Sequence, residues 1–150
     1  MRRLCRFLHL SWTDKALLVR AFFLLVTVRV GLSCLPFQTL RKLLAKTTEG
    51  RSFKVQRYQA DQSQGVIWAV GVVGRHFPSI GTCLMQALAA HALLARRHYP
   101  TQLHIGVTRD GKGKFLGHAW LESNGNVILG GEALRQQHYT PLLAMDHLEN

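Results

Sequence analysis

The 150-residue chain has few acidic residues, and this shortage narrows the kinds of partner expected for it. Eight Asp and Glu stand against 19 Lys and Arg, which leaves a formal net charge of +11. Such a surplus favours an anionic partner: nucleic acid, an anionic lipid surface or an acidic peptide. A solvated basic surface without a specific partner is the alternative. Disorder is excluded, because hydrophobic residues make up 47% of the chain.

Cysteine is also scarce. Cys5, Cys34 and Cys83 are odd in number and far apart, so they do not form a disulfide framework and fit a reducing, cytoplasmic compartment. The eight histidines are scattered, and no C-x-x-C or H-E-x-x-H motif accompanies them. The sequence therefore predicts no metal site.

The chain lacks a long apolar run free of charge. We do not expect its first residues to act as a signal peptide, because Arg6 and His9 interrupt the apolar stretch there. Residues 16–35 are long enough to span a membrane but include Arg20 and Arg29. An arginine near the centre of a span costs about 2.5–3.5 kcal/mol on the insertion scale. Because the apolar residues recur at helical spacing, we expect an amphipathic or mostly buried helix, with peripheral membrane contact as a further possibility.

Composition divides the chain into three regions. Residues 1–50 predict helices with apolar and basic faces, and residues 51–64 turn polar and read as a linker. Residues 65–150 contain the candidate catalytic residues, Cys83 and His118, so we expect the functional core there. Within it, residues 66–73 fit a helix or a buried strand, of which we favour the helix, and a longer Ala/Leu-rich helix begins near Cys83.

Alternating apolar residues and Asp-Gly and Asn-Gly turn signals follow that second helix. Helices followed by an antiparallel meander predict an α+β fold. The expected strands are residues 102–108, 115–122 and 127–129.

Cys83 is the candidate nucleophile, because the sequence places it in the first turn of a helix. Unpaired N–H groups and the helix dipole stabilise a thiolate there, and the same N–H groups can hold an oxyanion. A small buried hydrophobic residue is the alternative interpretation of a lone cysteine.

His118 is the candidate base. Trp120 shares its strand face and can shield the imidazole, and Gly117 leaves room for a substrate backbone, so both are predicted substrate-binding residues. A half-buried sheet histidine is the alternative for His118. The residue that orients the imidazole is expected to be Glu132, with Glu122, Asn126 or no third side chain as alternatives.

Several blocks of this sequence resemble one family. They are Cys-Leu-x-x-Ala-Leu-Ala with Leu-Leu-x-Arg-Arg, then Leu-His-Ile-Gly-Val, Gly-His-Ala-Trp-Leu-Glu, Leu-Gly-Gly and Tyr-Thr-Pro-Leu. In this order and spacing they resemble the B2-type lasso-peptide maturation protease, a transglutaminase-like leader peptidase. The resemblance is close over residues 65–143. Such enzymes commonly place an Asp after the histidine strand, where this chain has Leu129-Gly130-Gly131-Glu132.

The resemblance implies a papain/transglutaminase-like fold in which the Cys83 helix packs on an antiparallel sheet. Cys83 would attack a peptide carbonyl, with His118 as general base, and remove the leader of a ribosomally made precursor. It also implies no cofactor, no nucleic acid, a separate PqqD-like leader-recognition protein of the B1 type, and a lasso cyclase as partners.

Two alternatives remain open. A transglutaminase-like acyltransferase would form the same acyl-enzyme and pass the acyl group to an amine. A basic, membrane-associated binding protein would use Cys83 and His118 only for packing.

Overall fold

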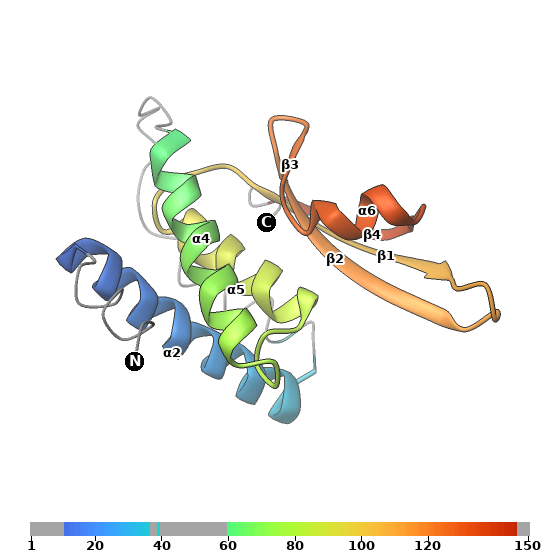
Figure 1. The fold of residues 1–150 in the computed structure, drawn as a ribbon, viewed down its shortest axis with the longest axis horizontal. Coiled ribbons are helices and arrows are strands. Elements are labelled where there is room, and N and C mark those ends of the chain that lie inside the picture. Colours follow the sequence, from blue (N-terminus) through green and yellow to red (C-terminus); the bar gives the residue numbers. More distant parts are fainter. Residues whose placement is uncertain (1–10, 37–38, 40–59, 147–150) are drawn as a thin grey trace, which may run out of the picture.

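The structure, a computed structural model, describes residues 11–36, 39 and 60–146, in which helices and an antiparallel sheet form two adjoining parts (Figure 1). The predicted α+β class is confirmed. The three long helices are α2 (Trp12–Cys34), α4 (Ala60–His76) and α5 (Cys83–Ala95). The four strands are β1 (Gln102–Arg109), β2 (Phe115–Ser123), β3 (Asn126–Leu129) and β4 (Thr140–Asp146), with a short helix, α6 (Gly131–Gln136), between the last two.

Helix α2 confirms the helix predicted over residues 16–35 and has clear end signals. Ser11 is the N-cap, and its hydroxyl accepts a hydrogen bond from the backbone N–H of Asp14 at 3.2 Å. At the other end, Leu35 is extended because it precedes Pro36, and the helix stops there. The helix is long and apolar enough to cross a membrane, but a third (33%) of its most apolar window is buried within the protein.

Helix α4 corrects the predicted linker. It begins at Ala60, so residues 60–64 are helical, whereas residues 51–59 lie outside the described part of the chain. The polar composition of residues 60–64 indicated a linker, but the first turn of a helix readily holds polar residues near its unpaired N–H groups. The helix predicted over residues 66–73 is confirmed as the rest of α4.

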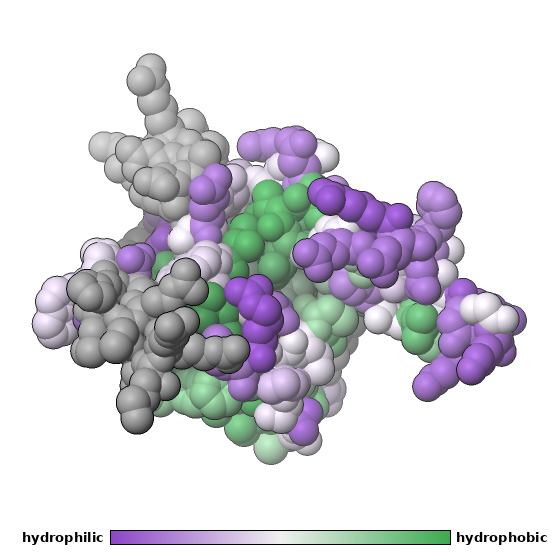
Figure 2. Space-filling view, in the orientation of Figure 1, coloured by the Kyte–Doolittle hydropathy of each residue, from purple (hydrophilic) through white to green (hydrophobic). Residues whose placement is uncertain are grey.

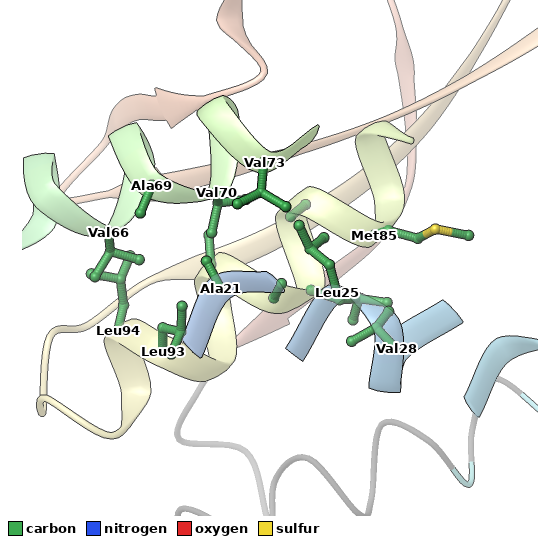
Figure 3. Close-up of a cluster of buried hydrophobic side chains, with 14 of the residues drawn as sticks. Ala21, Leu25, Val28, Val66, Ala69, Val70, Val73, Met85, Leu93 and Leu94 are labelled. Atoms are coloured by element: carbon green, nitrogen blue, oxygen red, sulfur yellow. The ribbon is translucent and has the colours of Figure 1, made fainter. Parts of the chain in front are cut away.

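Helices α2, α4 and α5 share one hydrophobic core (Figure 3). Leu25 and Val28 of α2, Val70 of α4 and Leu94 of α5 are all fully buried in it. Alanines on α5 let its neighbours approach closely, since Ala87, Ala89 and Ala90 are also completely buried. The N-terminal helix therefore packs directly against the helix that begins with Cys83.

The sheet has the order β3-β2-β1-β4, and its neighbouring strands are antiparallel. The three predicted strands are observed, and a two-residue turn, Asn124-Gly125, joins β2 to β3 with positive φ at both positions. Leu103, Ala119 and Leu121 belong to the core that includes α5. Because side chains alternate along a strand, His118, Trp120 and Glu122 are on the other face of β2.

Candidate active site

A pocket of about 800 Å³ contains both residues of the predicted catalytic pair. It is bounded by α4, the first turn of α5, strands β2 and β3, and α6. Figure 2 shows apolar surface between the helical part and the sheet, next to the hydrophilic side chains of α6. The residues that line the pocket are Ile67, Trp68, Gly71, Arg75, Cys83, Gln86, His118, Ala119, Val127, Ile128, Leu129, Gly130, Gly131, Glu132, Ala133, Arg135 and Gln136.

Cys83 is the first residue of α5, as predicted, and it is a free, half-buried thiol. The N-cap, Thr82, makes no side-chain hydrogen bond to the helix, so its hydroxyl does not occupy the N–H groups of the first turn. These N–H groups are donors for a negative charge that develops on a carbonyl oxygen beside Cys83.

The loop before Cys83 is held by its contacts with α4 and α5. Gln86, one turn along α5, donates a hydrogen bond from Nε2 to the carbonyl of Gly81. A Cβ atom on Gly81 would collide with the backbone of Gly74 near the end of α4. Two glycines thus let the two segments meet backbone to backbone, which fixes where α5 begins.

His118 lies on β2, and a backbone carbonyl fixes its ring. Its Nε2 is 2.8 Å from the carbonyl oxygen of Gly130. Because that oxygen can only accept, Nε2 carries the proton in this contact, and Nδ1 of the neutral ring keeps its lone pair. A base with a free lone pair on Nδ1 is what thiol activation requires.

Aromatic rings flank His118. Trp120 lies nearly parallel to the imidazole, with ring centroids 6.2 Å apart and planes at 14°. Tyr139, which precedes β4, contacts the same imidazole at a centroid distance of 5.2 Å. Beyond Trp120, His104 stacks at 5.3 Å and 10°. The imidazole thus has restricted freedom to rotate.

The comparisons with known proteins agree with this arrangement. A family model described as the Transglutaminase-like superfamily matches residues 22–144. The chain belongs to this superfamily. A comparison with curated proteins and another with solved structures each gave no match. The activities of the superfamily are generally of the cysteine-protease type, as peptidases or acyltransferases. The match extends from α2 into β4, and therefore includes both the helices and the sheet.

No carboxylate orients His118 within the part of this transglutaminase-like domain that the structure describes. Glu132, the predicted third residue, lines the pocket on α6 but is exposed and makes no described hydrogen bond to His118. Glu122 accepts a hydrogen bond from Trp120 Nε1 at 2.9 Å, and its other oxygen is 3.4 Å from Nε2 of His104. Asn126 donates to the carbonyl of Asn124. Of the four options, the one without a third side chain fits best, with the Gly130 carbonyl as the contact.

The two predicted substrate-binding residues differ in position. Trp120 is 5% exposed and does not line the pocket, and its packing against His118 agrees with a shielding role. Direct substrate contact at Trp120 stays a prediction. Trp120 lies over Gly106, where an added Cβ would be 3.0 Å from the indole. Gly117 is exposed and has no neighbour within 4 Å of an added Cβ, so substrate contact there stays a prediction.

Sequence reasoning missed several residues of the site. Gly130 and Tyr139 hold His118, and Trp68, Arg75 and Arg135 line the pocket. A signal was present for the first two, because Leu-Gly-Gly and Tyr-Thr-Pro-Leu are among the blocks that resemble the family. Within the described ranges, no group of three or more His, Cys, Asp or Glu side chains could hold a metal ion.

We expect the two glutamates to differ in their effect on activity. Glu132→Ala is expected to lower kcat/KM by less than about threefold, because the carboxylate does not contact His118. Glu122→Ala is expected to lower it about 10- to 100-fold, because Trp120 and His104 lose their shared partner and the stack beside His118 shifts. Steady-state kinetics on both variants measures the difference. An inactive Glu132→Ala with an active Glu122→Ala would instead make Glu132 the orienting residue.

Proposed function

We propose that this protein is a cysteine peptidase that removes the leader from a ribosomally synthesised lasso-peptide precursor. The observation that carries the proposal is the placement of Cys83, at an uncapped helix start, in the same pocket as His118, whose Nε2 is held by Gly130. Membership of the transglutaminase-like superfamily supports the reaction class, and the sequence blocks described above support the lasso-peptide substrate.

In the proposed reaction His118 takes the thiol proton on Nδ1, and the Cys83 thiolate attacks the carbonyl of the scissile peptide bond. The N–H groups of the first turn of α5 stabilise the oxyanion of the tetrahedral intermediate. The C–N bond then breaks, and the leaving amine takes its proton from the imidazolium. Water, activated by the neutral imidazole, hydrolyses the thioester, releasing the leader with a free carboxylate and restoring the thiol.

The lining of the pocket suits a peptide. Apolar side chains from α4 and β3, including Ile67 and Ile128, offer contacts for aliphatic residues, while Arg75 and Arg135 offer positive charge. Strand β3 is at one edge of the sheet, so it can pair with an extended substrate segment. This geometry supports binding of an extended peptide whose scissile bond lies beside Cys83.

The proposed partners follow from the substrate. A separate PqqD-like B1 protein would bind the leader, and a lasso cyclase would join the freed amine to a side-chain carboxylate. The proposed location is the cytoplasm. No cofactor enters the proposed reaction, since thiol, imidazole and water supply every atom that moves.

The experiment that tests this function combines the purified chain with a lasso precursor and its PqqD-like protein and follows the peptide by mass spectrometry. We expect a free leader and a core peptide with a new N-terminus, and no product with Cys83→Ala. Adding a primary amine separates the alternatives. Capture of the leader as an amide in preference to hydrolysis would favour the acyltransferase. Peptide binding without cleavage, unaffected by Cys83→Ala, would favour a binding protein and overturn the proposal.

A further inference from the structure

Helix α2 presents an apolar stripe to solvent, on the side opposite its buried face. Trp12, Val19, Phe23 and Val30 follow one another at intervals of seven, four and seven residues, which places them on one face of a helix. They are 87%, 54%, 63% and 55% exposed. We call these four residues the α2 stripe. Large exposed apolar side chains gathered on one face are typical of an interaction surface.

The opposite face of α2 is committed to the core. Ala21, Leu25 and Val28 are completely buried there, against α4 and α5. A transmembrane position would remove these side chains from the core and place Arg20 and Arg29 in hydrocarbon. One apolar face of α2 is therefore buried in the core, and the α2 stripe is the apolar face of this helix that a partner can reach.

Positive charge is concentrated in the same part of the sequence. Residues 1–59 contain 12 of the 19 Lys and Arg but only two of the eight acidic residues, Asp14 and Glu49, and thus hold ten of the eleven net charges. On α2 itself, Arg20 and Arg29 are exposed. Burial, and then the charge of Arg20, lowers the pKa of Arg97, so these two guanidinium groups repel each other beside α2.

We propose that the α2 stripe lies in the surface of an anionic lipid bilayer, with the exposed Arg20 and Arg29 on the headgroups. The combination of an apolar face, including an exposed tryptophan, with an excess of positive charge is what interfacial helices use. Figure 2 shows hydrophobic surface along the lower margin of the molecule, where α2 runs. The proposal is independent of the peptidase reaction, since none of the α2 stripe lines the pocket.

Co-sedimentation of the full chain with vesicles tests the proposal. One set is phosphatidylcholine alone, and the other contains about 30% phosphatidylglycerol, to supply negative surface charge. We expect binding to the anionic set, and release of most of the protein at about 0.5 M salt, where charges are screened over a few ångströms. The double variant Val19→Ser/Phe23→Ser is expected to bind at least about tenfold more weakly, because it loses apolar contact with the acyl chains.

Phe115→Ser is the matched control. Phe115 and Phe23 are equally exposed, at 63%, but Phe115 begins β2, away from α2. Its binding should equal that of the unchanged chain, and circular dichroism checks that both variants are folded. The proposal is overturned if the unchanged chain does not bind vesicles or binds both sets equally. It is also overturned if the double variant binds as well as the unchanged chain, or if Phe115→Ser lowers binding by the same factor. The proposal would also be overturned if the double variant bound a partner protein more weakly but bound the vesicles as well as the unchanged chain does.

Discussion

Cys83→Ala and His118→Ala are each expected to lower the rate of precursor cleavage by roughly four orders of magnitude or more, since nucleophile and base act as a unit and losing either removes nearly all of the covalent pathway. Folding should not change measurably. Cys83 is only half-buried at the start of α5, and His118 is partly exposed in the pocket, so neither variant empties the core. Peptide mass spectrometry measures the rate, and thermal unfolding checks the fold.

Cys34→Ala is the matched control, because Cys34 is an exposed free thiol in the last turn of α2. It should keep full activity. Alkylation by iodoacetamide, followed at each cysteine, supplies a readout that needs no substrate. Cys83 should react faster than Cys34 near neutral pH, and His118→Ala should remove that advantage. Equal alkylation rates at the two thiols, together with an active Cys83→Ala, would contradict the assignment of Cys83 as nucleophile.

The elements around the pair were predictable because their signals are local. Cys83 precedes an Ala/Leu-rich run with helical spacing, and Asn124-Gly125 between alternating apolar residues indicates a hairpin. The placement of His118 on the middle of a strand followed from the same alternation. Local signals thus predicted which elements carry the thiol and the imidazole.

The missing pieces depend on tertiary contacts. Strand β4 is an edge strand that contains Pro141 and pairs with β1 across a register shift, so its sequence carries a weak strand signal. A register shift between Leu121 and Glu122 also separates the β2–β3 pairing from a simple hairpin. His118 contacts the backbone carbonyl of Gly130, and because every residue has such a carbonyl, the residue types in the sequence do not indicate this contact.

Gly130→Ala is therefore expected to reduce kcat/KM about 100-fold, which is the order of loss produced when a catalytic group is displaced by about 1 Å. Gly130 has φ +83°, and an added Cβ would lie 2.9 Å from the carbonyl oxygen of Ala119 and 3.2 Å from Nε2 of His118. Both contacts are too short, so the loop or the imidazole must move. Either movement breaks the 2.8 Å hydrogen bond that leaves Nδ1 as the base.

Gly113→Ala and Gly125→Ala isolate that effect, because the chain places both glycines at similar positive φ, +79° and +75°, with no atom within 4 Å of an added Cβ. All three variants should lose about 1–2 kcal/mol of stability from the left-handed backbone alone. Only Gly130→Ala should also lose activity and shift the pH profile of kcat/KM, which reports the protonation state of His118.

If all three variants lose activity in proportion to stability, the carbonyl of Gly130 has no positioning role. If only Gly130→Ala is impaired, a main-chain carbonyl performs in this domain the orienting task that a carboxylate side chain performs in a triad.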